Sequence, residues 1–298
     1  MRYELYHDES QLDGFWHGML LVPVNQKKKL IELLELARMN TRVDGKLSLK
    51  RVKKKNRIYS CAYSWITIGV ASLAQKFGNY NPQIYLGELV RNQRIYHFLD
   101  SEIGAKFILF CERDAHNQMV GYPDHASKIE TTFRIGVKGG LHYLGCEESP
   151  IEIVKMHFDG HEHYQRHLDK ARIVGRMKGL RDYCSIVDNQ GLIVDGSSDE
   201  NALNSQSHED CQLLQLTDLF VGGFRNLLSN AQNPIHKEIA QPLAIIKKKL
   251  DKGYARMKRS RWFRSICISQ SFLENGQWRF SDIEIIPSSP FSQKTLGF

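Results

Sequence analysis

LLQLTDLFVGG, at residues 213–223, is the stretch from which the fold can be worked out. Its interior holds no helix breaker, and its apolar side chains would surround most of a helix. At about 100° per residue, Gln215, Asp218 and Gly222 fall together on one narrow stripe. A helix that is apolar on most sides is usually buried, and a buried carboxylate is costly unless a cation pairs with it. We therefore predict a buried helix in which Asp218 faces a cation.

Either a basic side chain or a metal ion would satisfy the charge of Asp218. The basic candidate is Arg225, which follows Asp218 along the same predicted helix. The spacing places the two within about 20° of two full turns but about 10 Å apart along the helix axis, so Arg225 is a remote neighbour. The choice between an ion pair and a metal site depends on which acidic residues the rest of the chain adds.

The composition of the chain is that of a soluble globular protein. Its 298 residues suffice for one large domain or a domain with an appendage. A formal charge of +8 favours an anionic partner, nucleic acid first and an acidic membrane surface second. No signal peptide opens the chain, and its apolar runs fall far short of the about 20 residues of a membrane helix. The widely spaced cysteines contain no C-x-x-C pair, so we expect reduced thiols in a cytoplasmic protein.

The chain is predicted to begin with a β-hairpin that ends its first strand in carboxylates. Residues 2–8 alternate and are rich in aromatic side chains, which is typical of a strand. A turn signal at residues 13–14 precedes a second, largely buried strand at 15–24. Asp8 and Glu9 therefore lie at the end of the first strand, just before the hairpin loop. Strand ends are places where a rigid scaffold presents carboxylates to a ligand.

A second predicted strand also ends in a carboxylate. Residues 151–158 (IEIVKMHF) alternate cleanly, and Asp159 with Gly160 terminates them. The predicted elements follow the order of an α/β fold: strand, hairpin, strand, helix, strand, helix. In such a fold, neighbouring strand ends bring together carboxylates that are distant in the sequence. We predict one α/β domain over residues 1–230. Residues 231–298 are predicted to form a basic C-terminal extension, a helix plus a β-hairpin, packed on the same domain.

Basic residues gather in a second segment of interest. Residues 43–57 (VDGKLSLKRVKKKNR) form a β-hairpin candidate that ends in a basic run. One interpretation is a solvated loop. The other is a contact to nucleic-acid phosphates through Lys53, Lys54, Lys55 and Arg57, each of which would add to a salt-dependent affinity.

Carboxylates gathered in one cleft repel one another unless cations neutralise them. Mg²⁺ and Mn²⁺ accept such oxygen ligands. Two ions about 3.5–4 Å apart can activate a water molecule and stabilise the leaving oxygen in phosphodiester cleavage. A basic surface around an acidic centre suits a polyanion that is drawn to a metal site.

Three motifs carry a resemblance to a known family: a first strand ending in HDES, a later strand ending in FDG, and the LLQLTDLFVGG helix. Together they resemble the domain of unknown function family 3800, regarded as ribonuclease H-like, over residues 1–230. The resemblance implies a ribonuclease H-like mixed sheet flanked by helices. It also implies metal-binding carboxylates at Asp8, Asp159 and Asp218, with Glu9 as a further catalytic carboxylate and Gln215 orienting ligands or a water.

The resemblance leaves a geometric question at the first strand. In a regular strand Asp8 and Glu9 point to opposite faces, so both can serve one site only if the strand bends there.

A histidine-rich stretch competes with the carboxylates for a metal. HFDGHEHYQRH, at residues 157–167, contains His163 and His167 at helical i, i+4 spacing, which can place two imidazoles on one zinc ion. It is not an H-E-x-x-H motif, because the Glu precedes this pair. A smaller role is open to His161 or His163, which lie near Asp159 and could shuttle a proton or contact phosphate. The G-x-S-x-G turn is missing, so Ser/His/Asp nucleophile chemistry has no support. Phosphate-binding glycine motifs are also missing, so no nucleotide cofactor is expected.

Three functions remain in view. The first is a divalent-metal-dependent nuclease that acts on DNA or RNA with Mg²⁺ or Mn²⁺. The second is a non-catalytic nucleic-acid-binding module with the same fold. The third is a protein-interaction component whose basic runs serve solubility.

Overall fold

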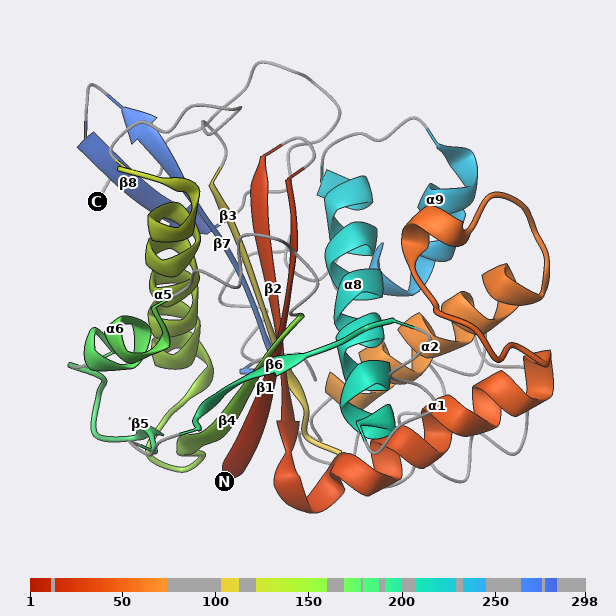
Figure 1. Ribbon diagram of the computed structural model, residues 1–298, viewed down its shortest axis with the longest axis horizontal. Coiled ribbons are helices and arrows are strands. Elements are labelled where there is room, and N and C mark those ends of the chain that lie inside the picture. The colour runs from red at the N-terminus through yellow and green to blue at the C-terminus, as the bar shows by residue number, and fades with distance from the viewer. Residues whose placement is uncertain are drawn as a thin grey trace.

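The computed structural model describes residues 1–11, 14–73, 103–112, 122–159, 169–177, 179–187, 191–199, 207–228, 233–244, 264–274 and 277–282. Figure 1 shows helices on both sides of a central sheet. Among the described residues, no helix is both long enough and apolar enough to cross a membrane.

The sheet is mixed, as predicted. Its strands are β1 (Arg2–Ser10), β2 (Phe15–Pro23), β3 (Lys106–Glu112), β4 (Ile151–Asp159), β5 (Cys184–Ile186), β6 (Ile193–Gly196), β7 (Ile266–Glu274) and β8 (Gln277–Asp282). They lie in the order β5-β4-β1-β2-β3-β7-β8, and β6 also pairs with β4. The pairs β1–β2, β2–β3 and β7–β8 are antiparallel, whereas β4 runs parallel to β1 and β7 parallel to β3.

Two groups of helices cover the two faces of the sheet (Figure 1). One face carries α1 (Lys27–Thr41), α2 (Arg57–Leu73), α8 (His208–Leu228) and α9 (Pro234–Ile239); the other carries α5 (His125–Leu144) and α6 (Lys170–Gly175). The strand side chains alternate between two apolar cores. Tyr6 and Leu20 join the core under α8, whereas Leu5 and Met19 join the core under α5. The alternation gives β1 two chemically independent faces.

Helix α8 is the buried helix that the sequence predicts, and small residues let it lie close to its neighbours. A Cβ added to Gly18 of β2 would lie 2.0 Å from the Val221 side chain. A Cβ added to Gly222 would lie 2.8 Å from Leu49 Cδ2. Leu49 begins the short helix η2 (Leu49–Arg51), which therefore packs directly on the Gly222 side of α8.

The hairpin prediction for residues 43–57 is wrong. The segment holds η2 and the start of α2, and no strand. The amide of Leu47 donates to Gln215 Oε1 at 3.0 Å, and the amide of Leu49 donates to Asp218 Oδ2 at 3.2 Å. Because α8 side chains accept these backbone bonds, the segment does not need a partner strand.

The C-terminal region belongs to the same sheet. The predicted hairpin is present as β7 and β8, and β7 pairs with β3 in parallel. The predicted helix after residue 233 begins as α9 (Pro234–Ile239), where Asn233 caps the first turn. The sequence pattern also predicts helices at residues 83–99 and 162–178. The first lies outside the described residues, and α6 is the described part of the second.

Candidate metal centre

Three elements bring the predicted aspartates together. Asp8 lies near the end of β1, Asp159 ends β4, and Asp218 lies on α8. His7 is the register partner of Phe158, so the next residues on the two strands, Asp8 and Asp159, lie beside each other on the adjacent parallel strands β1 and β4. Adjacent strands of a sheet lie about 4.8 Å apart. Helix α8 contacts both strands, and Asp218 acts electrostatically on Asp8. The three carboxylates therefore lie near enough to influence one another electrostatically, at one end of the seam between α8, β1 and β4.

The environment of these carboxylates disfavours their charge. Burial raises the pKa of Asp8 well above its ordinary value, and the charges of Asp218, Asp159 and Glu9 raise it further. Burial also raises the pKa of Asp218, although the Leu49 amide and two lysines oppose this shift. Both side chains keep partial solvent exposure. A cation that reached them would therefore relieve both the desolvation and the mutual repulsion.

Asp159 is held by a short polar segment after β6. Asp159 as a whole is 9% exposed. Ser198 Oγ donates to Asp159 Oδ2 at 2.5 Å, and the Ser198 amide reaches Oδ1 at 3.4 Å. Lys46 Nζ donates to the same Ser198 Oγ at 2.8 Å and to Asp199 Oδ1 at 3.0 Å. Lys46 thus brings a positive charge beside the aspartates while it bonds to Ser198 and Asp199.

Gln215 connects the two segments that hold the aspartates. Its Oε1 accepts from Arg38 Nη2 at 2.6 Å and from the Leu47 amide at 3.0 Å. Its Nε2 donates to the Ser198 carbonyl at 2.8 Å. One fully buried amide therefore fixes both the segment that donates to Asp218 and the segment that donates to Asp159. The sequence predicts that Gln215 orients ligands, and its contacts make it a positioning residue for these two carboxylates.

Glu9 lies away from the aspartates. The strand is regular at this point, with Asp8 opposite Gly18 and Glu9 opposite His17. Glu9 therefore points to the α5 face, where it groups with His7 and His17. The strand does not bend to bring Glu9 beside Asp8.

The remaining predicted residues lie outside the cluster. His161, His163 and His167 fall outside the described residues. Lys53, Lys54, Lys55 and Arg57 are exposed. Lys55 makes an ion pair with Glu238 of α9 at 2.7 Å.

A second polar cluster, absent from the sequence predictions, lies at the opposite end of the same seam. Glu4 of β1, His157 of β4 and Asp210 of α8 lie together. His157 Nε2 is 3.0 Å from Glu4 Oε2. The Tyr6 hydroxyl lies 2.6 Å from Glu4 Oε2 and 2.9 Å from Asp210 Oδ1, and it donates its one proton to one of these acids at a time. Lys27 Nζ binds Glu4 at 2.9 Å and Asp210 at 2.7 Å. The alternate positions 4, 6 and 8 of β1 are the sequence signal that could have revealed it.

Arg225 is accounted for by a different contact. Its Nη1 donates to Ser10 Oγ at 2.7 Å. The neighbours that lower the pKa of Asp218 are the Leu49 amide, Lys46 and Lys50, while burial acts in the opposite direction as the largest influence. The alternative of an Asp218–Arg225 pair therefore receives no support from these contacts.

The spacing of ligand atoms bears on how a metal would bind. Within the described part of the chain, two groups bring three ligand atoms within 4.8 Å of one another: His7 with Glu9 and His17, and Glu4 with His157 and Asp210. The three aspartates are not such a group. Two ions about 3.5–4 Å apart accommodate carboxylates that are spread more widely than a single ion allows.

Comparison of the chain with protein-family models, curated proteins and solved structures finds no match. The resemblance to the domain of unknown function family 3800 therefore rests on the HDES, FDG and LLQLTDLFVGG motifs alone.

Proposed function

We propose that the protein is a divalent-metal-dependent nuclease that hydrolyses phosphodiester bonds in DNA or RNA. The observation that carries this proposal is the convergence of Asp8, Asp159 and Asp218 from β1, β4 and α8. Burial and mutual repulsion raise the pKa of both Asp8 and Asp218. Oxygen ligands of this kind suit Mg²⁺ or Mn²⁺, and ribonuclease H-like chemistry uses such ions.

The chain's own groups would divide the work among them. The three aspartates would hold the ions, and such ions would supply an activated water and stabilisation of the leaving oxygen. Ser198 and the Leu49 amide keep the Asp159 and Asp218 carboxylates in place. Gln215 holds both of those supporting segments.

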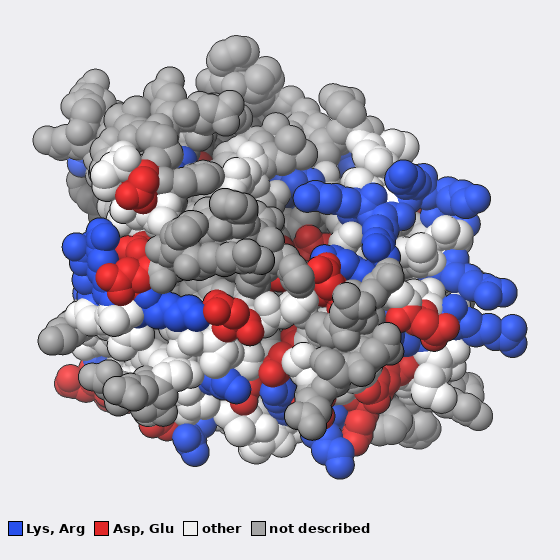
Figure 2. All heavy atoms as spheres, in the orientation of Figure 1, with Lys and Arg blue, Asp and Glu red and all other residues white. Residues whose placement is uncertain are grey.

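The surroundings of the aspartates suit a polyanionic substrate. The segment whose Leu49 amide binds Asp218 continues into the exposed basic residues Lys50, Arg51, Lys53 and Lys54. Figure 2 shows Lys and Arg side chains gathered over the part of the surface where η2 and the start of α2 lie, with acidic side chains beside them. A nucleic-acid backbone could contact these lysines while one phosphate lies at the aspartates.

The test is a cleavage assay with a matched control on the same helix. Labelled single- and double-stranded DNA and RNA are incubated with the protein and Mg²⁺, Mn²⁺ or a chelator. We expect metal-dependent cleavage that falls about a thousand-fold or more in Asp218→Asn but persists in Asp210→Asn, whose carboxylate already binds Lys27. Salt-sensitive binding without cleavage in any condition would favour the binding module, and no binding would favour the interaction component.

A further inference from the structure

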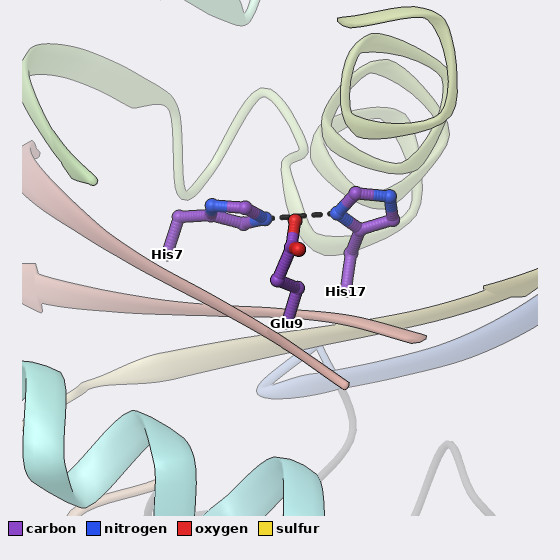
Figure 3. Close-up of side chains that lie close together, drawn as sticks. All are labelled: His7, Glu9 and His17. Atoms are coloured by element: carbon purple, nitrogen blue, oxygen red, sulfur yellow. Dashed lines mark hydrogen bonds between the residues drawn. The ribbon is translucent and has the colours of Figure 1, made fainter. Parts of the chain in front are cut away.

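The face of β1 opposite the aspartates carries a second set of metal-ligating side chains. Glu9 and His17 are register partners across the β1–β2 hairpin, and His7 precedes Glu9 by two positions, so all three share one face. Figure 3 shows their side chains converging, with the Glu9 carboxylate beside the space between the two rings. His7 Nε2 lies 2.8 Å from His17 Nδ1. Both histidines are 0% exposed, and Glu9 is 9% exposed.

The hydrogen bonds around His17 fix which ring nitrogen carries the proton. The Thr132 hydroxyl donates its one proton to the Lys128 carbonyl at 2.7 Å. It must therefore accept from His17 Nε2, which lies 2.7 Å from Thr132 Oγ1. His17 consequently carries its proton on Nε2 and directs the lone pair of Nδ1 into the cluster.

This assignment also fixes the tautomer of His7. Because His17 Nδ1 accepts, His7 Nε2 must donate across the 2.8 Å contact. The lone pair of His7 then lies on Nδ1, which is buried and has no hydrogen-bond partner among the described residues. A buried nitrogen without a partner is unfavourable. The His7–His17 arrangement is thus only partly satisfied by the hydrogen bonds of the protein.

Both rings are in the uncharged form that binds metals. Burial lowers the pKa of His7 to about 3. Burial, aided by His7 and Lys128, lowers the pKa of His17 well below its ordinary value. The rings pack among the aromatic side chains of Phe110, Phe133 and Phe158. An apolar shell of this kind limits the access of solvent to a metal site.

We propose that His7, Glu9 and His17 form a binding site for a transition-metal ion of the Zn²⁺ type, separate from the aspartates on the other face of β1. Two imidazoles and one carboxylate are a donor set that zinc accepts with a water as fourth ligand. The aspartate cluster offers only oxygen and suits harder ions. The bond from His17 Nε2–H to Thr132 is the outer contact that orients a ligating histidine. The site does not depend on nuclease activity.

Metal binding requires two small adjustments. With Zn–N bonds of about 2.0–2.1 Å and tetrahedral angles, the two ring nitrogens would lie about 3.3 Å apart. His7 and His17 must therefore separate slightly from their 2.8 Å contact. His7 must also move its proton from Nε2 to Nδ1, so the metal replaces the His7–His17 hydrogen bond and no proton is released overall. The Nδ1–H of His7 then has no partner among the described residues, as Nδ1 has none without the metal.

Titration of metal-free, full-length protein with Zn²⁺ tests the site, with Co²⁺ as a coloured substitute. We expect a stoichiometry of about one Zn²⁺ per chain at this site and a visible Co²⁺ spectrum typical of nitrogen and oxygen ligands in low coordination. His7→Gln and His17→Gln should abolish both signals. The double variant Asp8→Asn/Asp218→Asn should retain them, because those carboxylates face the other side of β1.

Two further measurements cover the possibility that a buried histidine variant does not fold. Thr132→Val keeps both ligands and is expected to weaken Zn²⁺ affinity about 10- to 100-fold by removing the partner of His17 Nε2–H. Nitrogen NMR of the histidine rings should show the His7 proton move from Nε2 to Nδ1 when Zn²⁺ is added. Unchanged His7 and His17 ring signals at saturating Zn²⁺ would overturn the proposal.

The histidine-rich segment supplies the last control. The triple variant His161→Gln/His163→Gln/His167→Gln should bind Zn²⁺ as the unaltered protein does. If this triple variant loses the ion while His7→Gln and His17→Gln keep it, the site lies in the histidine-rich segment and the proposal is wrong.

Discussion

The two ends of the seam between α8, β1 and β4 differ in how the negative charge of their carboxylates is neutralised. Each end gathers side chains from the same three elements: Glu4, His157 and Asp210 at one end, and Asp8, Asp159 and Asp218 at the other. At the first end Lys27 bonds to both acids. At the second end Lys46 lies near the aspartates but bonds to Ser198 and Asp199.

The pKa shifts record this difference. Burial alone would raise the pKa of Glu4, yet hydrogen bonds from His157, Tyr6 and Lys27 hold it well below its ordinary value. Burial raises the pKa of Asp8, and the neighbouring carboxylates raise it further. One end therefore has its carboxylates neutralised by the protein's own groups, whereas an added cation would stabilise the other. Because lysine neutralises the acids at one end only, we propose the aspartate end as the place for metal chemistry.

Replacing Lys27 should leave the two carboxylates at its end of the seam without their lysine partner. Lys27→Met leaves Glu4 and Asp210 facing each other without their cation, and both are largely buried. We expect the free energy of unfolding to fall by about 2–3 kcal/mol, somewhat less than for a fully buried pair. Urea denaturation at pH 7 measures it.

The double variant Lys27→Met/Asp210→Asn supplies the control for this loss. Removal of one acid should restore part of the lost stability, because it relieves the repulsion. A stability for Lys27→Met equal to that of the unaltered protein would mean that the ion pairs contribute nothing and that the contrast between the two ends has no energetic basis.

Gln215→Ala should affect the aspartate end specifically. It removes the amide that joins the Leu47 and Ser198 segments. The Leu47 amide and the Ser198 carbonyl are then buried without this hydrogen-bond partner, which lowers the free energy of unfolding by about 1–3 kcal/mol. Cleavage by the folded enzyme should fall about 10- to 100-fold, since small displacements of catalytic groups have effects of this size.

Gln212→Ala is the matched control for Gln215→Ala. Gln212 is also a buried glutamine of α8, but it contacts His208 and Glu35. It should lose stability with little change in cleavage per folded molecule. Equal losses of cleavage in both variants would show that Gln215 acts only through the stability of α8.

The two ends should also respond oppositely to pH. Glu4 has a lowered pKa, so its contribution to stability is present above the unfolded-state pKa and is lost as pH falls toward the folded-state value. Asp8 and Asp218 have raised pKa values, so their unfavourable contribution is absent below the unfolded-state pKa, grows as pH rises from that value toward the raised folded-state values, and is fully present above them.

Asp218→Asn isolates the pH response of the aspartate end. In the presence of a chelator it should stabilise the protein by about 1 kcal/mol at pH 8 and by little at pH 4. Denaturation curves at the two pH values measure this. The interpretation fails if the gain is the same at both.

The positions of the three aspartates on their strands and helix can be predicted from the sequence, because they depend on local sequence patterns. Turn residues end the strands at Asp8 and Asp159, and apolar periodicity places Asp218 on a buried helix. Strand alternation likewise predicts that Asp8 and Glu9 point to opposite faces, as they do.

Long-range contacts account for what the sequence does not predict. A lysine in the first turn of a helix opposes the helix dipole, and only the tertiary placement of α1 gives Lys27 its partners Glu4 and Asp210. The conformation of residues 43–57 depends on Gln215 and Asp218, which lie far along the chain. His7, Glu9 and His17 become neighbours only through hairpin register, which composition and spacing indicate weakly.

Direct measurement of Mn²⁺ binding tests the central claim that the aspartate end holds divalent ions and the lysine end does not. Metal-free protein is titrated with Mn²⁺ and the free ion is followed by electron paramagnetic resonance. We predict that Asp8→Asn weakens binding about ten-fold or more, while Asp210→Asn and His17→Gln bind as the unaltered protein does. Equal Mn²⁺ affinity in Asp8→Asn and the unaltered protein, or a loss confined to Asp210→Asn, would contradict the account.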